Sequence, residues 1–254
     1  MSYFTLGTWV VGLAIVVSVA GAVVGLACLR QSMLSATSWF RMIWRTAAAV
    51  SFAGTGTWLP IFITMLGLGP DGPGVIRFDL PRLTLSMAIV VAVTLAALLL
   101  LGARATLPQL ALACAVAGAG VAVMHVLMVS DLTVQGSVRT SPFAIAAVAV
   151  LSLVLVAATL AGTLRTRTLP GLTAVAVAFA VANAGVHYLG LAGVSVRLDH
   201  TAAMPTGSDL FSMFVPLFVL GTLTLAVPIT AVLVAPDRKA SQASASVPVA
   251  DFAR

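Results

Sequence analysis

Seven long apolar stretches run through this chain of 254 residues and constrain its fold more than any other feature. A membrane-spanning helix needs about 20 apolar residues, because each residue advances about 1.5 Å through a hydrocarbon layer about 30 Å thick. With 61% hydrophobic and 8% charged residues, the chain cannot form a water-soluble globule. The sequence predicts an all-α polytopic membrane protein with seven transmembrane helices, at residues 7–29, 43–68, 83–102, 108–130, 143–164, 171–194 and 211–235.

The basic residues predict how these helices are oriented. An N-terminus on the outside places nine Lys and Arg residues on the inner side and four on the outer side, and basic residues accumulate on the inner side of membrane proteins. We therefore expect N-out, C-in topology, with one membrane domain at residues 1–235 and a disordered cytoplasmic tail at 236–254 that is rich in Ala and Ser. The net charge of +6 then reflects orientation in a lipid bilayer, and nucleic-acid binding is excluded.

Three short segments at the predicted outer ends of the second, fourth and sixth helices repeat one another. They occupy residues 56–65, 120–128 and 185–191. When the segments are aligned, Ile61, His125 and His187 fall at equivalent positions, 64 and then 62 residues apart. The pattern predicts three two-helix repeats followed by a seventh helix.

Two of the three histidines in the chain, His125 and His187, lie inside predicted spans. An ionisable residue within a membrane is by default a candidate for function. Met124 and Met128 lie within a helical turn of His125, and Met65 lies near the matching level of the second helix. Imidazole and thioether together suit copper better than a hard cation, whereas a histidine pair alone could ligate a haem, the less favoured cofactor. The alternative is that the histidines are hydrogen-bonded to carbonyl groups and the methionines only fill the core.

The second and third segments resemble the MHYT domain of bacterial integral membrane sensors, which is named after its repeated Met-His-Tyr-Thr motif. The resemblance covers about residues 7–235. Matched by position, the motif's Met and His become Met124 and His125 in the second segment. Its His and Tyr become His187 and Tyr188 in the third.

The first segment departs from this motif. Trp58 and Met65 fit the family pattern, but Pro60 and Ile61 stand where the motif has Met and His. These motifs alone therefore exclude a site with three histidines. Either the site works with two histidines and methionine ligands, or the chain is a degenerate member that has lost metal binding.

The resemblance implies a sensor of the bacterial inner membrane that binds copper at its outer face. Through the metal, such a protein would sense oxygen, carbon monoxide or nitric oxide. Many family members carry a cytoplasmic output domain, whereas only the tail follows residue 235 here, so we expect signalling through a separate cytoplasmic protein. The expected metal ligands are His125, His187, Met124, Met128 and Met65.

Two other classes of protein are weighed against a sensor. A small transporter or channel also uses repeated helix pairs, but ion-coupled carriers commonly place charged residues in their spans, and the centres of these predicted spans carry none. An enzyme is not expected, because no nucleophile, base and orienting group occur at one depth and no phosphate-binding glycine loop precedes a helix.

Overall fold

The computed structural model describes residues 2–35, 37–69, 75–101, 106–166, 168–199 and 201–234. In chain order its helices are α1 (Trp9–Leu34), α2 (Ser38–Ala49), the π-helix η1 (Val50–Trp58), α3 (Leu59–Met65), α4 (Leu80–Leu100), α5 (Leu107–Ser130), α6 (Pro142–Arg165), α7 (Leu169–Ala192) and α8 (Leu210–Val234). The strands are β1 (Ile76–Phe78), β2 (Leu132–Val134), β3 (Gly136–Thr140) and β4 (Val194–Leu198). The predicted tail at 236–254 lies outside the described residues.

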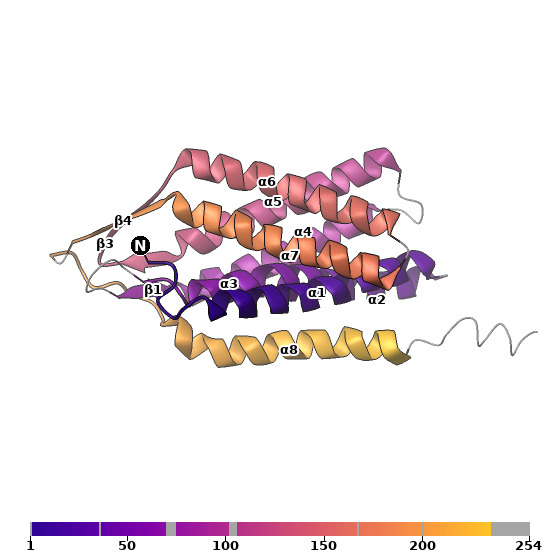
Figure 1. Cartoon of the computed structure of the whole chain (residues 1–254), viewed down its shortest axis with the longest axis horizontal. Coiled ribbons are helices and arrows are strands. Elements are labelled where there is room, and N and C mark those ends of the chain that lie inside the picture. Colours follow the sequence, from indigo (N-terminus) through magenta and orange to yellow (C-terminus); the bar gives the residue numbers. More distant parts are fainter. Residues whose placement is uncertain are drawn as a thin grey trace, which may run out of the picture.

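Six helices in the described part of the chain are long and apolar enough to span a membrane. They are α1, α5, α6 and α7, residues Pro81–Leu100 of α4, and the run Ser38–Met65 that joins α2, η1 and α3. The prediction of a multi-pass helical membrane protein is thereby confirmed. Helix α8 lies along the same bundle, against η1, α1 and α3 (Figure 1). That α8 forms a seventh span, and that the N-terminus is outside, stay predictions.

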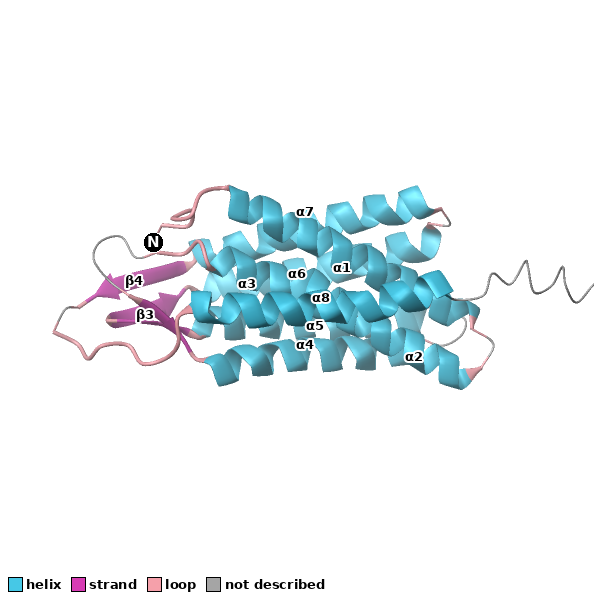
Figure 2. Ribbon diagram, turned by 90° about the horizontal axis from the view of Figure 1, so that it is seen from below, coloured by secondary structure: helices cyan, strands magenta, loops and turns pink. Residues whose placement is uncertain are grey.

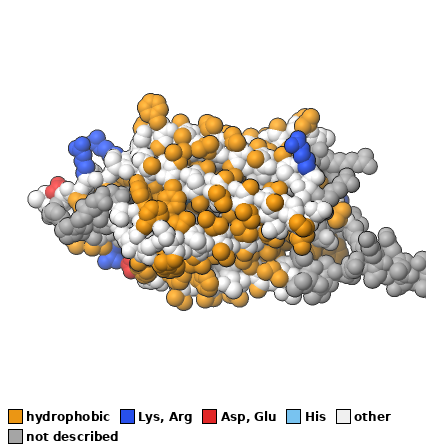
Figure 3. Space-filling model, viewed as in Figure 1, with side chains coloured by type: hydrophobic (Ala, Val, Ile, Leu, Met, Phe, Trp, Pro, Cys, Tyr) orange, Lys and Arg blue, Asp and Glu red, His pale blue; other side chains and the backbone are white. Residues whose placement is uncertain are grey.

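The surface of the bundle is consistent with a lipid environment. On the face shown in Figure 3, hydrophobic side chains cover the helical part, and the charged side chains lie toward its two ends. Large apolar side chains are exposed along α6, among them Val150 and Val154. Apolar surface of this extent is not stable in water, so it requires lipid or a partner.

Helices α5 and α7 begin with the same three residues, Thr-Leu-Pro. The side chains of Thr106 and Thr168 accept hydrogen bonds from the backbone N–H groups of Gln109 and Gly171, respectively. Threonine is a favoured N-cap, and proline is tolerated in the first turn because its missing N–H has no partner inside the helix there. The two helices therefore start at equivalent positions of the second and third repeats.

Pro60 interrupts the second span and follows directly on the π-helix η1. Because proline has no backbone N–H, the carbonyl of Gly56 loses the partner that a regular helix would give it. The hydroxyl of Ser18 on α1 donates to this carbonyl at 2.6 Å. The amide of Asn183 on α7 donates to the adjacent carbonyl of Thr57 at 3.4 Å. Neighbouring helices thus satisfy the interrupted backbone, as an irregular helix within a membrane requires.

Helix α1 approaches η1 closely through two glycines spaced four residues apart. A Cβ atom on Gly21 would lie 2.6 Å from the Cα atom of Gly56, and one on Gly25 would lie 2.6 Å from the Cβ atom of Phe52. Small residues at this spacing allow two helix backbones to pack against each other in membranes. The contact positions α1 so that Ser18 reaches the backbone around Pro60.

All four strands lie at one end of the bundle, together with the described N-terminal residues (Figures 1 and 2). We call it the strand end. Strand β1 pairs antiparallel with β2, and β3 pairs antiparallel with β4. From the sequence we predicted helices alone, so these two sheets were not expected. Runs of three to five residues are too short to show the alternation that marks a strand in a sequence.

Candidate metal centre

His125 and His187 occupy corresponding places on two neighbouring helices. Each lies 19 residues after the threonine that caps its helix, on α5 and α7 respectively. A rise of about 1.5 Å per residue puts both about 28 Å from the start of the helix, close to the strand end. The shared Thr-Leu-Pro start and the equal spacing bring the two side chains to one level.

The two imidazole rings face each other in the interior of the bundle. Their centres are 6.1 Å apart and their planes make an angle of 47°. His125 is 3% exposed and His187 is 1% exposed. We predicted from the sequence that these two residues are ligands of one metal ion, and in the structure their side chains lie close together.

The Nε2 atoms of the two rings have no hydrogen-bond partner among the described residues. The Nδ1 atom of His125 lies 2.9 Å from the carbonyl oxygen of Val121, one turn earlier in the same helix. A carbonyl only accepts, so Nδ1 carries the proton and Nε2 has a free lone pair. Among the described residues, the Nε2 atoms of both His125 and His187 are buried and have no hydrogen-bond partner. Buried polar atoms are rarely left in this state unless they serve a function.

A cavity of about 60 Å³ lies beside the pair. It is lined by the two histidines and by residues of α5, α6, α7 and β3: Val126, Val129, Ser130, Thr140, Ala144, Ile145, Val148 and Gly190. The lining is mainly apolar, so a polar molecule or ion here would interact chiefly with the imidazoles. The cavity has room for a small ligand next to the two unpartnered nitrogens.

The first repeat reaches the same place without a histidine. Ile61 is 1% exposed and lines a second cavity, of about 10 Å³, together with His187, Pro60 and Asn183. Ile61, His125 and His187 are equivalent positions in the three repeats, and His187 lines a cavity with each of the other two. The repeat alignment from the sequence therefore identifies positions that converge in space.

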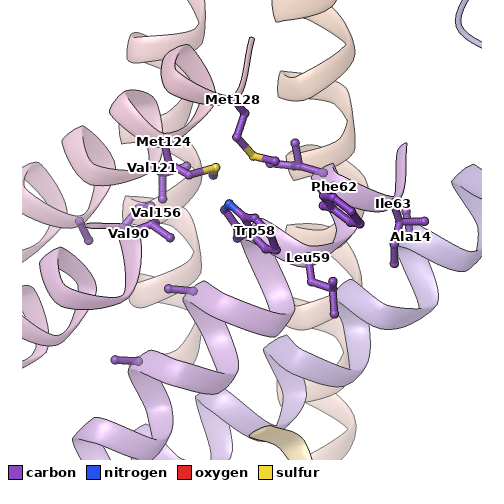
Figure 4. Packing of buried hydrophobic residues seen from close by; sticks show 14 of the residues in the cluster. Ala14, Trp58, Leu59, Phe62, Ile63, Val90, Val121, Met124, Met128 and Val156 are labelled. Atoms are coloured by element: carbon purple, nitrogen blue, oxygen red, sulfur yellow. The ribbon is translucent and has the colours of Figure 1, made fainter. Parts of the chain in front are cut away.

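The three candidate methionines lie elsewhere in the interior. Met65, Met124 and Met128 are each at most 1% exposed and belong to the main apolar cluster. Figure 4 shows the side chains of Met124 and Met128 beside Trp58. The residues that line the cavity beside the histidines include none of the three.

Aromatic residues near the chain start cover the third repeat. Tyr188 lies against His187, with ring centres 5.6 Å apart, and Tyr3 and Phe4 lie against Tyr188 at 6.5 and 5.7 Å. The hydroxyl of Tyr3 donates to the carbonyl of Leu191 at 3.3 Å. The contacts of Tyr3 and Phe4 with α7 were not predicted from the sequence. Nothing in the residues before the first span indicates which helix they pack against.

The geometry of the histidine pair is compatible with one metal ion. A metal–nitrogen bond of about 2 Å and a ring radius of about 1 Å place the ring centre about 3 Å from a bound metal, so two rings on one ion are at most about 6 Å apart. The observed distance of 6.1 Å between the ring centres is within reach of this limit. No group of three or more His, Cys, Asp or Glu side chains suited to a metal occurs in the described part of the chain.

Comparison with known proteins identifies a family for part of the chain. Residues 54–115 match the MHYT family model, described as a bacterial signalling protein N-terminal repeat. The matched segment contains the first repeat, with Trp58, Pro60, Ile61 and Met65, and ends within α5 before His125. No curated protein and no solved structure matched the chain.

Proposed function

The chain carries a repeat of the MHYT family of bacterial membrane signalling proteins, and from this premise we propose that it is a sensor whose input site is a copper ion held by His125 and His187. The observation that carries the proposal is the buried pair of facing imidazoles, each with an unpartnered Nε2 atom. Two neutral imidazoles in an apolar environment, with thiolates and carboxylates absent from the lining, favour copper over a hard cation. A bound copper ion would supply a centre for oxygen, carbon monoxide or nitric oxide.

The methionines are not needed to account for the pair. Their burial around Trp58 supports a packing role, so we propose the two histidines as the ligands supplied by the described residues. A haem is less favoured for a physical reason. The cavity of about 60 Å³ is far smaller than the roughly 300 Å³ or more that sites for larger ligands provide.

Copper content of the purified full-length chain tests the proposal. Protein loaded with Cu(I) under reducing conditions and then passed over a chelating resin should retain about one copper per chain, because loss of the ion would leave both nitrogens unpaired again. His125→Ala and His187→Ala should each lose most of it, since one remaining imidazole holds an ion weakly. Met33→Ala, a methionine change on α1 far from the strand end, is the control.

Three results separate this proposal from its alternatives. Retention of copper by both histidine variants would refute the assignment of the ligands. Wild-type protein that binds no copper yet remains folded would support the degenerate structural member. Copper-independent uptake of a solute into proteoliposomes would favour the transporter.

We further propose that the output passes to a separate cytoplasmic protein at the end of the bundle opposite the strand end. Both ligand-bearing helices extend the full distance between the two ends, α5 starting after Thr106 and α7 after Thr168. A copper-dependent change in maleimide labelling of a cysteine introduced at Thr166 would support transmission to that end. Identical labelling rates with and without copper would contradict it.

A further inference from the structure

Asp131 is a buried carboxylate that the copper proposal does not use. It is the residue that ends α5 at the strand end, and it is 1% exposed. Neither of its carboxylate oxygens has a hydrogen-bond partner among the described residues. A charged carboxylate in this state has lost its hydration without compensation, which is costly.

The surroundings of Asp131 make a negative charge still less favourable. Strand β1 pairs with β2 so that Phe78 lies opposite Leu132, and Asp79 and Asp131 are the residues that adjoin this last pair of the ladder. The two carboxylates are close enough for the charge of Asp79 to act on Asp131, and like charges brought together repel. The C-terminal end of a helix also carries a partial negative charge, and Asp131 sits at that end of α5.

Asp79 differs from Asp131 because it is compensated. One of its oxygens accepts a hydrogen bond from the backbone N–H of Arg82 at 3.4 Å, and the other lies 3.4 Å from the Nε atom of the same arginine. The charge on Asp79 is therefore stabilised by Arg82. Of the two carboxyl groups, Asp131 is the one for which ionisation is unfavourable. Burial, and after it the nearby Asp79, raise the pKa of Asp131 to about 6, while Arg82 acts in the opposite direction.

We propose that Asp131 is a proton-binding site that makes the pairing of β1 with β2 depend on the pH at the strand end. With a proton bound, the carboxyl group is neutral and the two aspartates no longer repel. When the proton leaves, a buried negative charge lies near Asp79 at the end of the β1–β2 ladder. The protein would then report acidity as a second input.

Few charged groups lie around Asp131, so the electrostatic influence on its proton affinity can be assigned to particular residues. Asp79 and Arg82 are the ones that act on it. Arg77 of β1 is paired in register with Thr133 of β2. Within α5 the ionisable side chains other than Cys114 are limited to His125, six residues before Asp131.

The proposal is independent of copper, and metal-free protein tests it. Infrared titration of the full chain in nanodiscs, with a chelator present, should show a protonated carboxyl band that disappears with an apparent pKa near 6. Asp79→Asn should lower this pKa because it removes the repelling charge, and Arg82→Gln should raise it because it removes the attracting charge. Asp209→Asn, an exposed carboxylate at the same end, should leave it unchanged.

Stability gives a second readout with a defined sign. Because the folded pKa is raised above the ordinary value of 3.8, the proton's contribution is fully present below that value and is lost as the pH rises through about 6. The unfolding equilibrium constant should rise roughly 100-fold between about pH 3 and about pH 7 relative to Asp131→Asn.

Several outcomes would overturn the proposal. One is the absence of the carboxyl band at pH 5, and another is a pKa that neither Asp79→Asn nor Arg82→Gln moves. These measurements do not require Asp131→Asn to fold. A divalent cation that replaces the proton at pH 8, with stability restored only when Asp131 is present, would identify a metal site instead.

Discussion

Replacing Gly21 by alanine should destabilise the bundle, although the same change at Gly12 of α1 should not. The new Cβ atom would lie 2.6 Å from the Cα atom of Gly56, where an ordinary contact needs at least about 3.5 Å. Helix α1 must therefore move by about 1 Å, and the 2.6 Å hydrogen bond from Ser18 to the Gly56 carbonyl is stretched beyond bonding distance.

The expected magnitude follows from opposing contributions. Overpacking costs about 1–3 kcal/mol, and the lost hydrogen bond adds about 1 kcal/mol. Alanine in place of glycine in a helix returns about 1 kcal/mol. We expect Gly21→Ala to lower the free energy of unfolding by about 1–3 kcal/mol, with the loss of packing as the dominant contribution.

Gly12 provides the matched control. It lies on the same helix, and a Cβ atom there meets nothing within 4 Å. Gly12→Ala should be neutral or stabilising by up to about 1 kcal/mol, since only the helix propensity changes. Unfolding in mixed micelles of increasing SDS content, followed by far-UV circular dichroism, measures both variants. If Gly21→Ala is as stable as Gly12→Ala, the close approach of α1 and η1 is not as described.

Two further substitutions test the site itself. Ile61→His should place a third imidazole next to His187 and tighten copper binding at least about tenfold, because each added ligand strengthens a metal site. Titration with a competing chelator measures the copper affinity of this variant and of the control Ile61→Leu. Equal affinities would refute the convergence of the repeats on one site. Met124→Leu should keep its copper and lose less than about 1.5 kcal/mol of stability, since the two side chains have similar volume; metal analysis and unfolding check this, and loss of copper would make the thioether a ligand.

Sequence reasoning located the helices and the pair of histidines for physical reasons. A span must be apolar throughout and about 20 residues long, so its position can be read from the local composition. Six of the predicted helices are confirmed as long and apolar enough to span a membrane. The proximity of His125 and His187 followed from a repeat spacing of 62 residues on helices of equal length. The first inference depends on the composition of each span, and the second on the similarity between two repeats.

The features that the sequence did not reveal depend on contacts between distant segments. The π-helix before Pro60 forms where Ser18 and Asn183 supply hydrogen bonds from α1 and α7, and no pattern within the second span announces it. The pairing of β1 with β2 likewise joins residues 56 positions apart in the chain, such as Arg77 and Thr133. Which methionines line the cavity beside the histidines depends on side-chain direction, which helical spacing alone leaves open.

The strand pairing connects the ends of helices that belong to different repeats. Strand β1 lies between α3 and α4, β2 and β3 both lie between α5 and α6 with only Gln135 between them, and β4 follows α7. Because β1 pairs with β2 and β4 pairs with β3, the segment that follows α5 is held on both sides at the strand end. A displacement of α5 would therefore be passed on to α4 and α7. Helices of different repeats would then move together and not as independent hairpins.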